Sequence, residues 1–180
     1  MKKTWFAPLL LLACGMPVAS AWASEPTSVD ITLTGKIISN TCTIDKDASD
    51  LAPALDTISD RDMKGKGAVK GLKDIKIALT DCGVDTKSVE VTASGTAQDA
   101  TGDVNAFQNT GTATGVGLYF YETDGTTPFS PAGNVKQTVP LNPDASGNAA
   151  MTFKAGYVSV TDAPVAGDFK SLVTLSLTYL

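Results

Sequence analysis

The sequence contains no histidine among its 180 residues and only three cysteines. Histidine is the commonest general base and the commonest metal ligand, so its absence removes the simplest routes to acid–base catalysis and to a zinc site. No pattern supplies a nucleophile beside a base or a pair of catalytic carboxylates. We therefore expect a protein that is not an enzyme and that needs no metal and no cofactor.

Long apolar runs are also absent, apart from one short stretch near the N-terminus. Two lysines precede an apolar run from Trp5 to Ala13, and small residues lead to a cleavage site after Ala23. This order predicts a secretory signal peptide over residues 1–23, because the run is too short to remain as a membrane span. A lipoprotein signal, in which Cys14 carries the lipid, is the competing interpretation.

Positive charge is scarce. The chain has 14 basic and 19 acidic residues, and its formal net charge is −5. Loss of the two lysines in the predicted signal takes this charge to −7, since that segment holds no acidic residue. Such a surface repels nucleic acid and anionic lipid headgroups. We expect no nucleic-acid partner.

Two cysteines remain after the predicted signal, Cys42 and Cys82. In an exported protein they are expected to form a disulfide. Closing a loop of this length corresponds to about 4 kcal/mol in the chain-entropy model. Free buried thiols and a pair of metal ligands are the alternatives, and the second lacks further ligands of the kind zinc prefers.

Helical periodicity is missing, whereas alternation of apolar and polar residues recurs along the chain. This period of two predicts strands with one buried face. Gly, Pro and Asn-rich turns separate the segments at short spacing, which favours an all-β sandwich. The region from Ser94 to Thr114 is rich in small polar residues and is expected to be a long exposed connection. The alternating segments lie around residues 29–37, 75–79, 89–93, 116–120, 151–153 and 169–179.

The last of these segments is the most regular. Most of its apolar residues share one parity up to Tyr179, while threonine, serine and lysine hold the other; Ser171 and Leu172 are the exceptions, one on each face. A strand this amphipathic needs a partner along its edge, since an exposed apolar edge invites aggregation. Either residues 29–37 pair with it within the chain, or they pair with a neighbouring molecule by strand addition.

The order of these features resembles the type 1 pilins assembled by the chaperone–usher pathway, over essentially the whole chain. The resemblance rests on a signal peptide, an alternating N-terminal segment, two cysteines in strand-like contexts, a glycine fourteenth from the end and a penultimate aromatic residue. The matching stretches are Val29 to Ile37, Asn40 to Ile44, Ile75 to Cys82, Gly167 and Tyr179.

This resemblance implies an incomplete immunoglobulin-like β-sandwich that lacks its last strand. A periplasmic chaperone would lend a strand, an outer-membrane usher would assemble the subunits, and the N-terminal extension of the next pilin would replace the chaperone. The implied donor residues of this chain are Val29, Ile31, Leu33, Gly35 and Ile37. The implied acceptor-groove or chaperone-contact residues are Gly167, Phe169, Val173, Leu175, Leu177 and Tyr179.

The domain prediction that follows is a cleaved signal over residues 1–23, a donor-strand extension over 24–37 and a pilin domain over 38–180. The function implied is that of a structural subunit of a surface fimbria that contributes to cell adhesion. Gly35 has a second interpretation, as a bulge in an ordinary first strand.

Two other functions compete with this one on the residues alone. A carbohydrate-binding sandwich would use Tyr119, Tyr121, Tyr157 or the 94–114 region. The spacing of Asp45, Asp47 and Asp50 partly matches the ligand spacing of a calcium-binding loop. However, Asp50 stands where the sharp turn of such a loop requires glycine. A solvated acidic loop is the simpler interpretation of that stretch.

Overall fold

The computed structural model describes residues 29–37, 41–98 and 103–180. The predicted signal peptide and residues 24–28 lie outside these ranges. The chain divides into two units, Met1–Lys36 and Ile37–Leu180, which are described separately. In the described part, no helix is long and apolar enough to cross a membrane.

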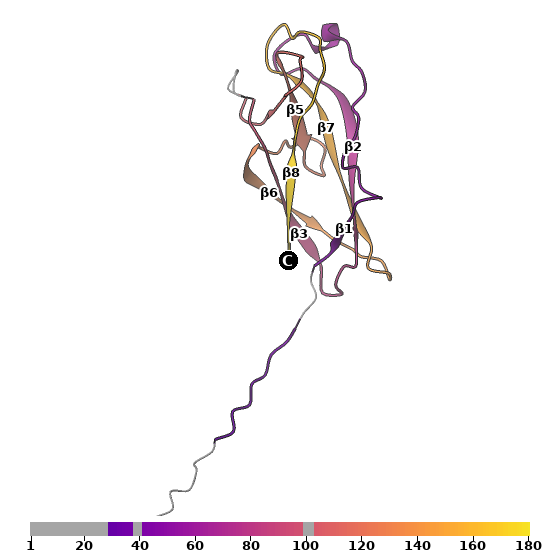
Figure 1. Ribbon diagram of the computed structural model, residues 1–180, viewed down its shortest axis with the longest axis vertical. Coiled ribbons are helices and arrows are strands. Elements are labelled where there is room, and N and C mark those ends of the chain that lie inside the picture. The colour runs from indigo at the N-terminus through magenta and orange to yellow at the C-terminus, as the bar shows by residue number, and fades with distance from the viewer. Residues whose placement is uncertain (1–28, 38–40, 99–102) are drawn as a thin grey trace, which may run out of the picture. The chain divides into compact units, whose positions relative to one another are not determined.

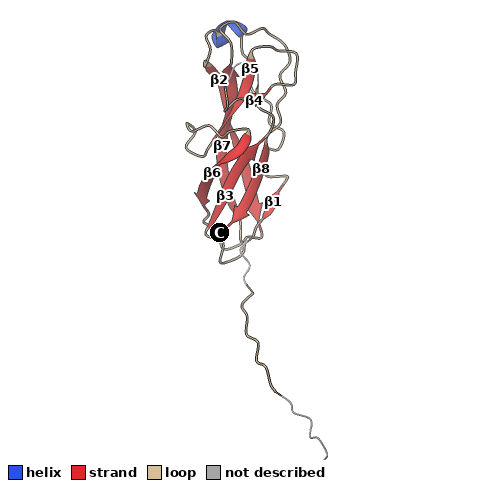
Figure 2. Cartoon of the chain, turned by 90° about the vertical axis from the view of Figure 1, so that its left-hand side faces the viewer, coloured by secondary structure: helices blue, strands red, loops and turns tan. Residues whose placement is uncertain are grey.

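The described residues of the second unit form strands in two antiparallel sheets, which is the predicted all-β sandwich (Figure 2). One sheet has the strand order β1-β2-β7-β5-β4, and the other has the order β6-β3-β8. The elements are β1 (Thr43–Asp45), the 3-10 helix η1 (Asp60–Met63), β2 (Val69–Thr80), β3 (Ser88–Ser94), β4 (Phe107–Gln108), β5 (Val116–Tyr121), β6 (Ala132–Pro140), β7 (Ala149–Ser159) and β8 (Thr174–Tyr179).

The predicted alternation places one face of each long strand in the core. On β2, Ile75, Ile77 and Leu79 are buried, while Lys70 and Lys76 are exposed. The strand starts six residues before the predicted segment, because it continues through a register shift between Lys70 and Lys73. Gly71 lies in that shift with a φ of +64°, a conformation that glycine adopts without strain.

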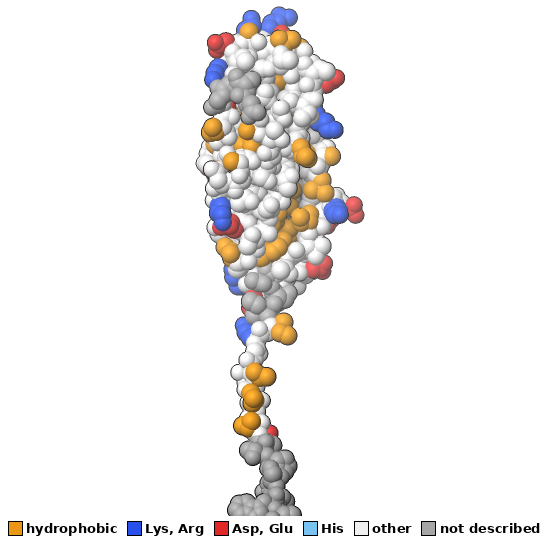
Figure 3. All heavy atoms as spheres, turned by 60° about the vertical axis from the view of Figure 1, so that its left-hand side comes forward, with side chains coloured by type: hydrophobic (Ala, Val, Ile, Leu, Met, Phe, Trp, Pro, Cys, Tyr) orange, Lys and Arg blue, Asp and Glu red, His pale blue; other side chains and the backbone are white. Residues whose placement is uncertain are grey.

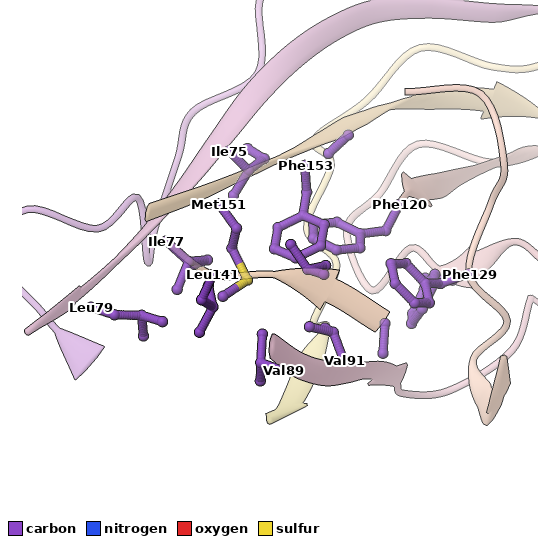
Figure 4. Close-up of a cluster of buried hydrophobic side chains, with 14 of the residues drawn as sticks. Ile75, Ile77, Leu79, Val89, Val91, Phe120, Phe129, Leu141, Met151 and Phe153 are labelled. Atoms are coloured by element: carbon purple, nitrogen blue, oxygen red, sulfur yellow. The ribbon is translucent and has the colours of Figure 1, made fainter. Parts of the chain in front are cut away.

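The core fills the space between the two sheets (Figure 4). Ile75, Ile77, Met151 and Phe153 on one sheet face Val89 and Val91 on the other. Three phenylalanines form its aromatic centre, with ring centroids 5.5 Å apart for Phe120 and Phe153 and 6.0 Å apart for Phe120 and Phe129. These contacts bury apolar area from both sheets and hold the sandwich together.

The expectation that residues 94–114 form an exposed connection is wrong in part. Phe107 on β4 is completely buried in the core, and Ala106 is buried in a smaller cluster with Val158 and Val160. β4 adds a short edge to β5, where Phe107 pairs with Leu118. One aromatic residue among small polar neighbours gave no periodic signal that distinguishes a strand from a loop.

The predicted disulfide between Cys42 and Cys82 is confirmed. It joins the residue before β1 to the turn that follows β2, and the backbone N–H of Gly83 donates to the carbonyl of Thr41 at 3.0 Å. The entry of the chain into the domain is therefore fixed covalently to the end of its longest strand.

Residues 29–37 form no strand in the described structure, although their sequence alternates like one. Val29, Ile31, Leu33 and Ile37 are exposed, with 76% to 100% of their surface accessible. A strand is stable only as part of a ladder, because its backbone groups bond to a neighbour rather than to themselves. The alternation of this segment is thus not used within the described chain.

Candidate strand-acceptor groove

The C-terminal strand β8 is paired on one edge. It pairs with β3 from Val89 opposite Tyr179 to Ser94 opposite Thr174, and no other ladder to it occurs among the described residues. Leu175, Leu177 and Tyr179 pack against the core but stay half-buried. A strand with an open edge and incompletely buried apolar side chains is a template for an added strand.

A groove of about 600 Å³ lies beside that open edge. Its floor is made of core residues from β2, β5 and β7, so an object in the groove would contact the core directly. Figure 3 shows apolar side chains gathered in a band along the domain. The lining residues are Ile44, Asp50–Leu55, Ile75, Ile77, Leu118, Phe120, Ala155, Tyr157, Phe169–Val173, Leu175 and Leu177.

Past β1, the wall opposite β8 is held to β2 by individual hydrogen bonds rather than by a strand ladder. After β1 ends at Asp45, the hydroxyl of Ser49 accepts from the N–H of Ala78 at 2.9 Å. The carboxylate of Asp50 accepts from the N–H of Lys76 at 2.9 Å, and the Asp50 N–H donates to the Lys76 carbonyl at 2.8 Å. Two short polar side chains thus accept backbone N–H groups on the edge of β2. The following residues, Leu51–Leu55, line the groove.

The acidic stretch proposed as an alternative calcium loop has this structural role. The carboxylate of Asp45 accepts the backbone N–H groups of Asp47 and Ala48, each at 3.0 Å, in a turn. The carboxylate of Asp50 faces the N–H of Lys76. Within the described ranges, no group of three acidic or cysteine side chains is arranged as a metal site.

Aromatic residues stand at both ends of the segment from Phe169 to Tyr179. Tyr157 and Phe169 pack edge to face at one end, with ring centroids 4.9 Å apart. Burial raises the pKa of Tyr157, and the charge of Asp56 adds to the effect. At the other end, burial raises the pKa of Tyr179, while a hydrogen bond with the backbone of Cys42 opposes the shift. Tyr179 therefore links the end of β8 to the start of β1.

The residues implied by the pilin resemblance fall in different places. Phe169, Val173, Leu175 and Leu177 line the groove, whereas Tyr179 lies outside the lining and bonds to the backbone of Cys42. The predicted donor residues Val29, Ile31, Leu33, Gly35 and Ile37 are exposed and belong to the segment without a strand, where a Cβ added to Gly35 would meet nothing within 4 Å.

Gly167 is placed outside the groove lining. A Cβ added there would lie 2.4 Å from the backbone nitrogen of Ala113, so this glycine allows two backbone segments to approach closely. Sequence reasoning missed Ile44 and the Asp50–Leu55 wall. The only signal for the wall was its apolar composition, Leu51-Ala52-Pro53-Ala54-Leu55, directly after an acidic stretch.

The tyrosines of the carbohydrate-binding alternative do not form one platform. Tyr119 and Tyr121 share one face of β5, where the Tyr119 hydroxyl donates to Asp103 at 2.7 Å and the two rings pack edge to face. Tyr157 pairs with Leu118 in the ladder and therefore belongs to the opposite face of the sheet.

A family model described as fimbrial protein matches residues 31–180 of this sequence. The chain belongs to the fimbrial protein family. Fimbrial subunit ElfA of Escherichia coli strain K12 is 29% identical over 190 residues, which covers 99% of each chain. Protein FimG of the same strain is 26% identical over 175 residues, covering 97% of this fimbrial subunit and 98% of its relative.

Solved structures agree on the fold. The Burkholderia pseudomallei antigen and type I fimbria protein BPSL1626 has 27% identity and a TM-score of 0.55, and the match covers 79% of this chain and 92% of that one. The P pilus rod subunit PapA has 17% identity and a TM-score of 0.62, covering 77% and 99%. A chaperone–usher pilus structure has 18% identity and the same score, covering 89% and 100%. The fold is the immunoglobulin-like fold of pilin subunits.

Membership in this family establishes the general function of the chain. The fimbrial subunit is a structural component of a surface pilus, and it polymerises with neighbouring pilins. Its relatives are structural subunits and not enzymes.

Proposed function

We propose that this fimbrial subunit is joined to its neighbours by strand exchange. The groove beside β8 receives the N-terminal segment of one neighbour, and residues 29–37 of this chain enter the groove of another. The observation that carries the proposal is the pairing of β8 on one edge only, beside a groove floored by core residues. The immunoglobulin-like sandwich is then completed by a strand from a second molecule.

The energetics favour a durable contact. The four large donor residues Val29, Ile31, Leu33 and Ile37 are largely exposed in the free chain. Burying each contributes about 1.5 to 3 kcal/mol, so the four together contribute roughly 6 to 12 kcal/mol before ordering costs. Main-chain hydrogen bonds to the open edge of β8 add to this, which gives a fibre strength without covalent links between subunits.

Gly35 marks the place in the donor where the backbone comes closest to the groove. The other donor positions of the same parity carry large apolar side chains, so the missing side chain matches a narrow part of the floor.

The open groove also sets the requirements of assembly. We infer that residues 1–23 direct export to the periplasm, and that a periplasmic chaperone covers the edge of β8 until the next subunit arrives. An outer-membrane usher then passes the subunits to the cell surface. Adhesion is in this view a property of the assembled fibre, to which the subunit contributes as a structural part.

A strand-uptake experiment tests the proposal. Residues 35–180, which lack most of the donor, are incubated with a peptide covering residues 24–37, and peptide uptake is measured together with resistance of the complex to detergent. Uptake of the native peptide is expected. A peptide with Leu33→Asp is expected to lose uptake, because the charge would enter the apolar groove.

The matched control is a peptide with Thr32→Asp, which carries the same charge on the opposite face of the strand. It is expected to bind nearly as well as the native peptide. Equal uptake of the Leu33→Asp and Thr32→Asp peptides contradicts the donor assignment. A chain 24–180 that never forms detergent-resistant ladders in the presence of its chaperone contradicts strand exchange itself.

A further inference from the structure

Two exposed apolar residues stand at opposite ends of the pilin domain. Val84 follows β2 and is 87% exposed, while Leu172 precedes β8 and is 76% exposed. The length of β3 separates them. Val84 lies four residues before Ser88, where β3 begins, and Leu172 lies two residues before Thr174, which pairs with Ser94 at the end of β3. Figure 1 shows the turn between β2 and β3 at one end of the sandwich and the start of β8 toward the other.

The loop that carries Val84 is ordered by its own hydrogen bonds. The backbone N–H of Thr86 donates to the Gly83 carbonyl at 2.9 Å, and the Lys87 ammonium donates to the Val84 carbonyl at 3.2 Å. Gly83 and Thr86 are buried, whereas Val84 and Asp85 are exposed. The loop therefore presents one apolar and one acidic side chain from a fixed backbone.

The same loop stands where the N-terminal segment joins the domain. The Gly83 N–H donates to the carbonyl of Thr41 at 3.0 Å. From Ile37 to Thr41 there are four peptide steps, which reach at most about 14 Å. Whatever holds Ile37 therefore lies within a short distance of the Val84 loop.

The orientation of an added strand decides which part of the neighbouring subunit holds Ile37. All ladders of the described structure are antiparallel. A donor added antiparallel to β8 has Val29 near Tyr179 and Ile37 near the Phe169–Leu172 end of the groove. The nine residues of the donor span about 27 Å at the usual rise of a strand, which matches the length from residue 179 to residue 171.

These constraints bring the Val84 loop of one subunit to the groove mouth of the next. We propose that the surface formed by Val84 and Asp85 docks on Lys170 and Leu172 of a second copy of this chain, as a contact in addition to the donor strand. The proposal rests on the strand exchange proposed above. Val84 contacts Leu172, and the carboxylate of Asp85 pairs with the ammonium of Lys170. All four side chains are exposed in the free subunit.

A second copy is the occupant because one chain carries both halves of the contact. The acidic and apolar loop lies at one end and the basic and apolar rim at the other, so each copy uses both surfaces. Such a head-to-tail interface does not close on itself and extends into a filament. The contact thus indicates a subunit that follows itself in the fibre.

Cross-linking tests the contact. The full chain with Val84→Cys and Leu172→Cys is exported and assembled in cells, and the polymer is treated with a short bismaleimide. A ladder of covalent multimers is expected. The matched control combines Val84→Cys with Thr138→Cys, an exposed residue of β6, and is expected to give none.

The outcomes separate the two proposals. Absence of detergent-resistant polymer in the unmodified chain defeats strand exchange. Polymer without cross-links in the Val84→Cys, Leu172→Cys chain overturns the docking contact alone. Dimers formed by Val84→Cys by itself overturn it too, because they indicate parallel insertion. Cross-links that join this chain only to a different subunit overturn the choice of a second copy.

A charge exchange gives an independent readout. Asp85→Lys and Lys170→Asp each place like charges together and are expected to slow assembly at low salt by up to about fivefold, the size typical of an exposed pair. The double variant is expected to recover the original rate, and the differences are expected to vanish at high salt. Failure of the double variant to recover overturns the pairing.

Discussion

Tyr157 of β7 and Phe169, which precedes β8, pack edge to face with ring centroids 4.9 Å apart and an interplanar angle of 81°. Tyr157 belongs to the larger sheet, which supplies the groove floor, whereas Phe169 leads into β8 of the other sheet. The ring pair therefore ties the segment before β8 to the larger sheet.

Removing one ring should weaken both the domain and its groove. Phe169→Ala is expected to lower the free energy of unfolding by about 1 to 3 kcal/mol, below the loss for a fully buried phenylalanine, because Phe169 is half-buried. Urea unfolding measures the change, and uptake of the 24–37 peptide is expected to fall with it. Tyr157→Phe keeps the ring pair and serves as the control. Equal stability of Phe169→Ala and the unmodified domain contradicts a role for the pair.

The disulfide should account for a large part of the stability of the free domain. It joins Cys42 and Cys82 across a sequence separation of 40. The double variant Cys42→Ser, Cys82→Ser is expected to lose about 4 kcal/mol, chiefly because its unfolded chain is less constrained. Urea unfolding of the domain with and without a bound donor peptide measures this. A loss that is no larger than that of an exposed substitution contradicts the expectation.

Acid should loosen the turn after β5 through Asp124. The hydroxyl and backbone N–H of Thr127 and the backbone N–H of Thr126 donate to its carboxylate, which lowers the pKa of Asp124. A lowered pKa in the folded state means that the stabilisation is present above the unfolded value, about 3.9, and is lost as the pH falls below it. The urea midpoint should therefore decrease on acidification.

Asp124→Asn isolates this contribution. The variant is expected to be less stable than the unmodified domain near neutral pH and to approach it as the pH falls below about 4. Thr138→Asn, at an exposed residue of β6 outside that turn, is the control, because it removes no ionisable group. A constant difference between Asp124→Asn and the unmodified domain at all pH values would falsify the assignment.

The sequence predicted the strands whose alternation the core uses. In β2, β3, β5 and β7, the buried positions are those that the apolar residues of the alternating pattern predicted. The disulfide was predicted from two cysteines in a chain expected to be exported. β6 was not predicted. It has a single partner strand, β3, and only Val135 and Val139 are large apolar residues in it. Its pairing with β3 therefore depends on tertiary contacts that alternation does not reveal.

The groove could be predicted on one side only. The regular parity of Phe169 to Tyr179 indicated the β8 side, because period-two alternation reports a face directly. The opposite wall depends on Ser49 and Asp50, whose side chains bond to Ala78 and Lys76 on β2. These bonds join residues 26 and 29 positions apart, and polar side chains in a loop carry no sequence signal of such a partner.

Ser171 offers a final test of how the groove is completed. Its hydroxyl oxygen is buried in the groove wall and has no hydrogen-bond partner among the described residues. A buried unsatisfied hydroxyl destabilises the state that contains it. Ser171→Ala is therefore expected to raise the free energy of unfolding of the free domain by about 1 kcal/mol. Urea unfolding of residues 35–180 measures the gain.

An inserted donor strand would affect the Ser171 hydroxyl but not buried hydroxyls elsewhere in the domain. Ile37 of an antiparallel donor lies near Ser171, so the inserted backbone is expected to supply the missing partner, and Ser171→Ala should bind the 24–37 peptide several-fold more weakly. Thr86→Val removes another buried, unpartnered hydroxyl that does not line the groove. It is expected to stabilise the domain similarly and leave peptide binding unchanged. Unchanged binding in both variants would show that the donor does not satisfy Ser171.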